Sequence, residues 1–268
     1  MTKKLRVCLA GATGWVGCGL APAIAAAEDL ELVGAVSRSH AGRPLGEVLG
    51  DPDLTTTIQG TVAEALRTPC DVLVDYTSPE AVESHVRAAI AAGAHVVIGS
   101  SGVTEEQFAS IDQAARAKPV GVIAVGNFAI TAVLLQRFAE IAAKHLPAWE
   151  IIEYGHSRKP DAPSGTARQL ANRLAAIRRP ETEVAVEKTH GLPQARGASF
   201  QGSQIHSVRL PGFVSSMEIL FGLPDERLSI RHDSGSGAGP YIAGTLLAIR
   251  KVASFIGLRR GLDSLMDL

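Results

Sequence analysis

The sequence predicts an α/β protein with two parts: a parallel sheet covered by helices on both faces, and a smaller α+β domain with a mixed, open sheet. In the first half, short apolar runs rich in β-branched residues alternate with alanine-rich amphipathic stretches. This alternation is typical of a parallel sheet. After about Gly126, one long amphipathic stretch is followed by a series of strand-like segments. That change favours an open sheet with helices on one face.

The first part begins with a buried apolar run at 5–10, which predicts a strand, and an alanine-rich helix at 16–27. Further strands are expected over 30–37, 71–76, 95–98 and 121–124, and further helices over 62–66, 79–92 and 104–117. Two local signals support these helices. Ser78-Pro79 places a serine at an N-cap and a proline at the first helical position. Thr104, followed three residues later by Gln107, is a capping-box pattern.

The second part is expected to contain helices over 130–146 and 164–177, and strands over 150–154, 204–209, 216–221 and 227–232. The last helix, 241–256, is expected to return to the first domain. We therefore predict a dinucleotide-binding domain over 1–126, completed by 240–268, and a substrate-binding and oligomerisation domain over 127–239.

Composition excludes several classes of protein. Of the 268 residues, 46% are hydrophobic, which is enough to bury a core. A formal net charge of -1 and an aromatic content of 4% argue against a nucleic-acid binder. No apolar run is long enough to span a bilayer, and the three scattered cysteines suit a reducing compartment. We expect a cytoplasmic protein without a nucleic-acid or membrane partner, and without a metal, because the eight histidines show no ligand spacing such as H-x-x-x-H.

A glycine-rich turn follows the first expected strand and opens the first helix, with the spacing G-x-x-G-x-x-G over 11–17. Glycine permits a tight turn there and lets a pyrophosphate approach the N–H groups at the helix N-terminus. The turn therefore predicts a Rossmann-type cofactor site, and its alternative interpretation is a plain glycine-rich turn. The residues expected to bind the cofactor here are Gly11, Thr13, Gly14, Trp15 and Val16.

The end of the second expected strand bears on the choice of cofactor. Sites that select NAD usually place an acid there for the ribose 2′-hydroxyl. This chain has Ser37-Arg38-Ser39 instead, and Arg38 is suited to pair with a 2′-phosphate. We predict that NADPH is preferred over NADH. The alternative is that Arg38 is an ordinary solvated residue.

Several motifs, in order along the chain, resemble the dihydrodipicolinate reductase family. The most specific is Lys159-Pro160-Asp161-Ala162-Pro163-Ser164-Gly165-Thr166-Ala167, which matches the family pattern K-x-D-A-P-S-G-T-A. Other matching segments are Asp75-Tyr76-Thr77, Gly99-Ser100-Ser101-Gly102, Asn127-Phe128, 205–212 and Arg231-His232-Asp233-Ser234. The resemblance covers nearly the whole chain.

The resemblance implies a two-domain NAD(P)H-dependent reductase of a cyclic, unsaturated imine dicarboxylate, commonly a homotetramer. It also implies that several loop residues contact the cofactor, namely Tyr76, Thr77, Gly99, Ser101, Gly126, Asn127 and Phe128. Their expected place is consistent with this, because ligands of open α/β sheets bind beyond the carboxyl ends of the strands. For Tyr76, the alternative is a core aromatic residue.

The same resemblance assigns the segment Ser164-Gly165-Thr166 to a substrate carboxylate and gives Lys159 the role of a catalytic donor. The residues themselves suit these roles, because a helix N-terminus with two hydroxyls attracts an anion and the lysine adds a positive charge. The alternative is an ordinary helix cap beside a solvated lysine.

The chain departs from the family pattern E-x-H-H, because Gly155 stands at the first histidine, the family's presumed general acid. The second aligns with His156, which is a candidate replacement together with Tyr154 and Lys159. The segments 215–218 and 235–240 also differ from the family pattern. These departures leave two further hypotheses: an imine reductase or amine dehydrogenase of the same fold with another substrate, and a catalytically weak nucleotide-binding paralogue. The true substrate and the proton donor stay open.

Overall fold

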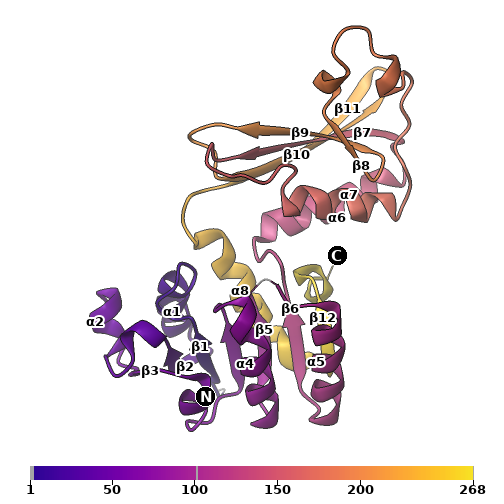
Figure 1. Cartoon of the computed structure of the whole chain (residues 1–268). Coiled ribbons are helices and arrows are strands. Elements are labelled where there is room, and N and C mark those ends of the chain that lie inside the picture. Colours follow the sequence, from indigo (N-terminus) through magenta and orange to yellow (C-terminus); the bar gives the residue numbers. More distant parts are fainter. Residues whose placement is uncertain (1–2, 101, 268) are drawn as a thin grey trace. The chain divides into compact units, whose positions relative to one another are not determined.

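The computed structural model describes residues 3–100 and 102–267 of the chain (Figure 1). These residues form two compact units. The first unit contains the chain up to Ile130 together with Ala238–Asp267, and the second contains Thr131–Gly237. In the described part of the chain, every helix is too short or too polar to cross a membrane.

The first unit contains a seven-stranded sheet in which all neighbouring strands run parallel. Its strands are β1 (Leu5–Ala10), β2 (Leu30–Val36), β3 (Ile58–Gln59), β4 (Val72–Asp75), β5 (His95–Ile98), β6 (Gly121–Ala124) and β12 (Gly257–Arg260). Their order is β12-β6-β5-β4-β1-β2-β3. The chain therefore leaves β1 toward β2 on one side and later returns to β4 on the other. Such a reversal is where nucleotides bind in open α/β sheets.

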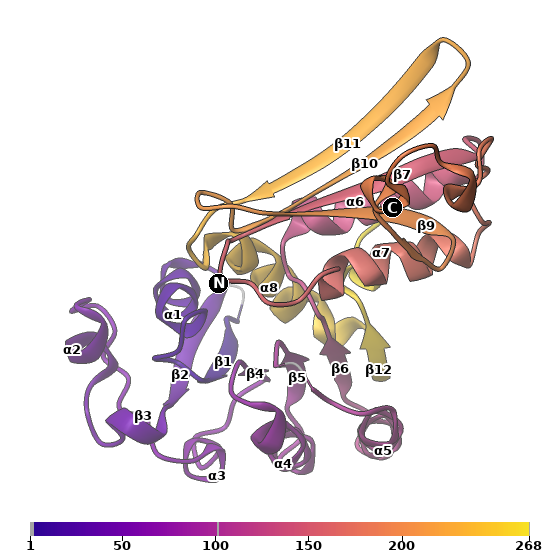
Figure 2. The ribbon, with the colours of Figure 1, turned by 45° about the horizontal axis from the view of Figure 1, so that its top comes forward.

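Helices cover both faces of this sheet, as predicted. They are α1 (Gly17–Ala26), α2 (Leu45–Leu49), α3 (Val62–Ala65), α4 (Pro79–Ala91), α5 (Glu105–Ala117) and α8 (Gly239–Lys251). Figure 2 shows α3, α4 and α5 on one face of the sheet and α1 and α8 on the other. A continuous apolar core joins α4 and α5 to the strands, with Val82, Val86 and Ile111 fully buried in it.

Local signals located most of these helices correctly. The Thr104 capping box is confirmed: the Thr104 N–H donates to the Gln107 side chain at 2.8 Å, and Thr104 Oγ1 accepts from the Gln107 N–H at 3.2 Å. Ser78 does occupy the N-cap of α4, but its side chain makes no capping hydrogen bond there.

The expected last helix, 241–256, is wrong at its end. Helix α8 stops at Lys251, a 3₁₀ turn covers Val252–Ser254, and β12 begins at Gly257. The backbone is already extended at Phe255, and Gly257, which has φ +89°, begins the strand. Four short elements were not expected from the sequence: β12, β3, helix α2 and a strand at Ala198–Phe200.

The second unit has a five-stranded sheet in the order β11-β10-β7-β9-β8. Its strands are β7 (Ala148–Gly155), β8 (Ala198–Phe200), β9 (Ser203–Arg209), β10 (Ser215–Leu223) and β11 (Glu226–Ser234). The β7–β9 pair is parallel and the other pairs are antiparallel, so the sheet is mixed and open, as predicted. Figure 2 shows β10 and β11 as a long hairpin at one edge.

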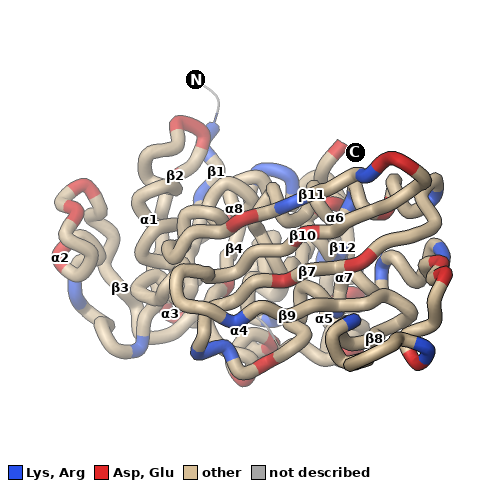
Figure 3. The backbone as a smooth tube through the Cα atoms, turned by 90° about the horizontal axis from the view of Figure 1, so that it is seen from above, with Lys and Arg blue, Asp and Glu red and all other residues tan. Residues whose placement is uncertain are grey.

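Two helices, α6 (Ile130–Ala143) and α7 (Gly165–Ala175), cover one face of the second sheet. Leu135 of α6 and Leu170 of α7 pack with Trp149, Ile151 and Ile219 of the strands in one buried cluster. Strand β7 alternates between half-buried and buried side chains, so the second face of the sheet is only partly exposed. Figure 3 shows acidic residues on β7 and β10 among mostly uncharged positions.

Candidate active site

The glycine-rich turn lies at the carboxyl end of β1, and its three glycines meet different demands. Gly11 has φ +85°, and a Cβ on it would overlap the Tyr76 carbonyl. A Cβ on Gly17 would overlap the Gly11 carbonyl. By contrast, a Cβ on the exposed Gly14 would meet only the Gly11 carbonyl, at 3.1 Å. Folding therefore requires Gly11 and Gly17, whereas the open space over Gly14 fits the approach of a pyrophosphate.

The other residues of the turn lie beside the end of β2. Thr13 Oγ1 and Ser37 Oγ are 2.7 Å apart, and Ser37 Oγ lies 3.4 Å from Ser39 Oγ. Trp15 is exposed and packs edge-on against Tyr241, with ring centroids 5.4 Å apart. Val16 occupies the N-cap position of α1.

Arg38 opens a 3₁₀ turn, Arg38–His40, directly after β2 and is exposed. The Ser78 hydroxyl and, more weakly, the Arg38 guanidinium hold the pKa of Glu80 below its usual value. The exposure of Arg38 is compatible with both interpretations of the sequence, a phosphate contact and an ordinary surface arginine.

Phe128 is buried in the first unit, and the half-buried Tyr76 packs against it. Tyr76 Oη lies 2.7 Å from Thr245 Oγ1, and its ring centroid is 5.7 Å from that of Phe128. A Cβ on Gly99 would overlap the Tyr76 ring, so Gly99 is required for this packing. Burial raises the pKa of the Tyr76 phenol. The Phe128 side chain is thus held in the interior, whereas the half-buried Tyr76 keeps some exposed surface.

The remaining predicted cofactor residues occupy loops at the same edge of the sheet. Gly126 is exposed just beyond β6, and Asn127 Oδ1 accepts a hydrogen bond from the Ala129 N–H at 2.9 Å. Thr77 follows β4 and is half-buried. Ser101 lies outside the described residues.

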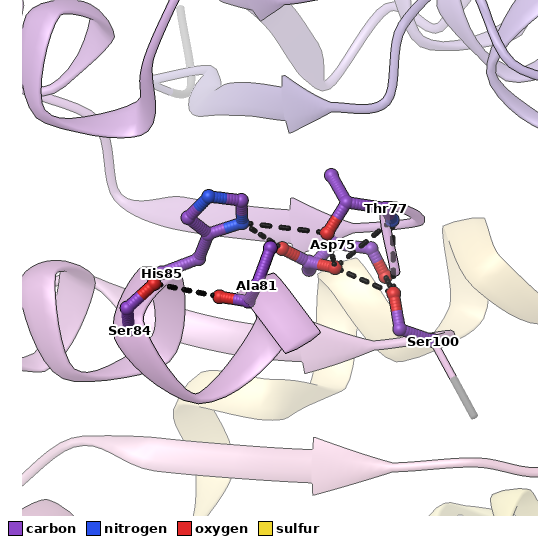
Figure 4. Close-up of polar contacts among 6 residues, drawn as sticks. All are labelled: Asp75, Thr77, Ala81, Ser84, His85 and Ser100. Carbon is purple, nitrogen blue, oxygen red and sulfur yellow. Dashed lines mark hydrogen bonds and ion pairs between the residues drawn. The ribbon is translucent and has the colours of Figure 1, made fainter. Parts of the chain in front are cut away.

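A buried carboxylate at the end of β4 organises this edge, and the sequence analysis did not single it out (Figure 4). The fully buried Asp75 accepts hydrogen bonds from Thr77, Ser100 and His85. Burial alone would raise the pKa of Asp75, but these hydrogen bonds outweigh it and leave the pKa below its usual value. The available signal was a single acid at the end of an otherwise apolar strand.

In the second unit, the predicted carboxylate site is the N-terminus of α7. Ser164 is the N-cap, and its Oγ accepts from the Ala167 N–H at 3.3 Å. The first turn carries no acidic residue, Gly165 is exposed, and the space where its Cβ would lie is open. With Thr166 half-buried beside it, this N-terminus has the free N–H groups and the positive dipole end that bind an anion.

A second buried carboxylate anchors that helix N-terminus to the sheet. Glu153 Oε1 accepts from the Ser164 N–H at 2.9 Å, from Ser207 Oγ at 2.6 Å and from the Arg209 guanidinium at 2.7 Å. Arg209 also donates to the Asp161 carbonyl at 2.6 Å. Although burial opposes it, this set of donors leaves the pKa of Glu153 below its usual value. Glu153 and Arg209 lie within motifs that matched the family, but they were not predicted as site residues.

Lys159 lies in the loop that these contacts hold. Its Nζ is 2.7 Å from Asp161 Oδ1, and this ion pair lowers the pKa of Asp161. A Cβ on Gly155 would lie 3.1 Å from Lys159 Cδ and 3.2 Å from Arg209 Nη1. The place of the family's first histidine is therefore bordered here by two cationic side chains.

The exposed His156 contacts the backbone of its own turn. Its Nδ1 accepts from the Arg158 N–H at 3.1 Å, and its carbonyl accepts from the Lys159 N–H at 2.9 Å. The structure thus brings His156 close to Lys159 along the backbone. Arg231 lies over the ring of Tyr154, 4.9 Å from its centroid, and Tyr154 donates to Glu218 at 3.3 Å.

Family comparison matches both halves of the chain. The family described as dihydrodipicolinate reductase, N-terminus, matches residues 5–128, and the one described as dihydrodipicolinate reductase, C-terminus, matches residues 131–266. A 4-hydroxy-tetrahydrodipicolinate reductase of Desulfitobacterium hafniense (strain DSM 10664 / DCB-2) is 38% identical over 267 residues, covering 99% of this chain and 100% of the relative. One of Moorella thermoacetica is 39% identical over 270 residues, with both chains fully covered.

Solved structures show the same similarity. The dipicolinate-bound dihydrodipicolinate reductase from Paenisporosarcina sp. TG-14 superimposes with a TM-score of 0.86 and 32% identity, covering 98% of this chain and 100% of that one. An amine dehydrogenase from Mycobacterium smegmatis shares the fold, with a TM-score of 0.65 and 15% identity over 96% of this chain and 95% of that one. The motifs, the two family matches and the full-length relatives agree, and the chain belongs to the dihydrodipicolinate reductase family of NAD(P)H-dependent oxidoreductases.

Proposed function

We propose that the chain reduces a cyclic imine dicarboxylate of the 4-hydroxy-tetrahydrodipicolinate type, as its relatives' names state for them. The observation that carries this proposal is the N-terminus of α7, an acid-free first turn capped by Ser164, with Lys159 in the loop before it. A dipicolinate-bound relative supports a dicarboxylate ligand.

Each group then has a defined task. A bound reduced nicotinamide would supply a hydride to a ring carbon of the conjugated imine. The open turn over Gly14 receives the pyrophosphate, and the α7 N-terminus with Thr166 orients one substrate carboxylate. Lys159, held by Asp161, would donate the proton that balances this hydride, so that one double bond of the conjugated imine is saturated. Glu153 and Arg209 act as positioning residues, because they fix the loop that carries the lysine.

The cofactor preference that we propose is NADPH over NADH. No acid lies at the end of β2, and the Thr13, Ser37 and Ser39 hydroxyls cluster there beside the exposed Arg38. Hydroxyls and a guanidinium are suitable partners for a 2′-phosphate.

We further propose a cytoplasmic homotetramer, as the family resemblance implies. The three cysteines are unpaired thiols, which suits a reducing compartment. Leu220, Leu223 and Leu228 leave apolar surface exposed on the hairpin of β10 and β11 in the second unit, which supports self-association there. Light scattering coupled to gel filtration tests the assembly.

A specific observation favours a second candidate, a reductase of a related imine. Gly155 replaces the family's histidine, and Lys159 and Arg209 border its place. A substrate with a further anionic group would meet those two cationic side chains, and a catalytically weak paralogue would show the same loss of the acid.

One assay separates these functions. NADPH oxidation is measured with 4-hydroxy-tetrahydrodipicolinate, the precursor, which its synthase generates in the assay. The same measurement is made with a panel of cyclic imines and with mixtures of keto acids and ammonia. We expect the highest kcat/KM on the precursor. The Gly14→Val variant serves as the matched control and should be inactive on every substrate. A higher kcat/KM on another imine would establish the second candidate. Cofactor binding with no turnover on any substrate would establish the weak paralogue.

A further inference from the structure

The buried Asp75 fixes the direction of every hydrogen bond around it (Figure 4). Its Oδ1 lies 2.8 Å from Thr77 Oγ1 and 2.6 Å from Ser100 Oγ, and its Oδ2 lies 2.8 Å from His85 Nδ1. The side chain has no exposed surface, and hydrogen bonds hold its pKa low. An ionised carboxylate only accepts, so Thr77, Ser100 and His85 must each direct a hydrogen toward it.

This arrangement uses the only proton of each hydroxyl. Ser100 Oγ donates to Asp75 and accepts from the Thr77 N–H at 2.9 Å. The Thr77 N–H is shared between Ser100 and Asp75 Oδ1, the latter at 3.0 Å. Thr77 Oγ1 donates to Asp75 and lies 3.4 Å from the His85 Nδ1–H, a long contact that it shares with Asp75, so its remaining capacity is one further acceptor position. At the half-buried Thr77, the chain therefore presents an acceptor to any ligand.

The position of Thr77 indicates which ligand group would donate to its hydroxyl. It follows β4, next to β1 and its glycine-rich turn, at the carboxyl edge where cofactors of open α/β sheets bind. The carboxamide of a nicotinamide carries an amino group, which is a donor. We propose that Asp75 is a positioning residue that makes the Thr77 hydroxyl an obligate acceptor for this amino group. This inference rests on the proposed function, because it requires a nicotinamide cofactor.

The test compares two cofactors that differ only in this donor. Dissociation constants of NADP⁺ and its 3-acetylpyridine analogue, in which a methyl group replaces the amino group, are measured by calorimetry. We expect the wild type to prefer NADP⁺ by about three- to ten-fold, the range for one uncharged hydrogen bond. In Thr77→Val the preference should fall to about one-fold because the acceptor is gone. Thr77→Ser should restore it.

Variants of the carboxylate probe its role through Thr77. Asp75→Ala frees the Thr77 hydroxyl to rotate and should shrink the preference. Asp75→Asn keeps one oxygen that accepts from Thr77 and Ser100, so this variant should retain most of the preference for NADP⁺. Ser84→Ala is the matched control. Ser84 lies on α4 beside His85, and its hydroxyl donates to the Ala81 carbonyl at 2.8 Å, outside the Asp75 network.

The ratio of the two constants distinguishes this role from general support of the fold. A merely structural change weakens both cofactors equally and leaves the ratio unchanged. An unchanged ratio in a folded Thr77→Val variant would overturn the inference and leave the proposed reductase function intact. If the wild type binds neither NADP⁺ nor NADPH, the proposed function itself fails.

Discussion

The Cβ position of Gly155 lies 3.1 Å from Cδ of Lys159. The lysine stem thus packs against a backbone that has no side chain, while its ammonium reaches Asp161 at 2.7 Å. The guanidinium of Arg209 approaches the same position, at 3.2 Å, and bonds the buried Glu153. The two cationic side chains therefore take their positions because residue 155 has no side chain.

This relationship predicts the result of restoring the family's histidine. Gly155→His should lower kcat/KM on the preferred imine by about tenfold or more, because an imidazole there must displace the lysine, and small misplacements of catalytic groups are costly. Gly155→Ala should lose less, since a methyl group needs a shift of only a few tenths of an ångström. Steady-state kinetics on both variants check this. A rise in turnover with Gly155→His would show that the site lacks an acid that Lys159 does not replace.

The cofactor preference depends on Arg38. Arg38→Asp should weaken NADPH binding by roughly ten-fold or more, the effect of losing a charge-assisted contact, and should change NADH binding much less. Fluorescence titrations with both cofactors measure the two constants. Arg67→Asp, which changes another exposed arginine of the first unit, is the control. Equal NADPH affinities of the wild type and Arg38→Asp would exclude Arg38 from the 2′-phosphate site.

Two glycines of the glycine-rich turn should differ in what their variants lose, cofactor binding for Gly14 and stability for Gly17. Gly14→Val should abolish cofactor binding with little change in Tm, because its side chain would fill the space over the turn and meets only the Gly11 carbonyl. Gly17→Ala should instead lower Tm, since its Cβ overlaps that carbonyl. Thermal melts and calorimetric titrations of both variants give the comparison. Normal binding by Gly14→Val would mean that the pyrophosphate lies elsewhere.

A half-buried histidine, His95, predicts acid sensitivity of the first unit. Burial lowers the pKa of His95, against the weaker opposing effect of Asp71, and its Nδ1 accepts from the Gly121 N–H at 2.9 Å. In the folded chain the ring therefore takes up its proton at lower pH than the unfolded value of about 6.5. Between the two pKa values the unfolded state binds more protons, so the free energy of unfolding falls as pH drops through this window.

His95→Gln should reduce that dependence, because the glutamine oxygen can accept the same hydrogen bond without titrating. Urea unfolding between pH 8 and pH 5 is the measurement, with the difference limited to about 1.4 kcal/mol per unit of pKa change. His190→Gln, at an exposed histidine, should leave the pH dependence as it is. Identical pH profiles for the wild type and His95→Gln would contradict this assignment.

The sequence was most informative where the determinant is local. The Thr104 capping box and the β1–turn–α1 segment need only neighbouring residues, and both were predicted correctly. The pairs Glu153–Arg209 and Asp75–His85 were missed because they depend on tertiary contacts. Parallel pairing of β7 with β9 places Arg209 beside Gly155, which no spacing along the chain reveals. The expected last helix was extended to 256, through the 3₁₀ turn, because apolar residues continue past Lys251, and no strand was expected after it.

The central claim, hydride transfer to an imine dicarboxylate, is tested most directly by following the hydride itself. The wild type is incubated with the precursor generated by its synthase and with NADPH that carries deuterium at the transferable C4 position. The product is then examined by mass spectrometry. We predict a reduced product that contains one deuterium on a ring carbon, formed at a rate that matches NADPH oxidation. A protein that binds NADPH but yields no deuterated product would contradict the account.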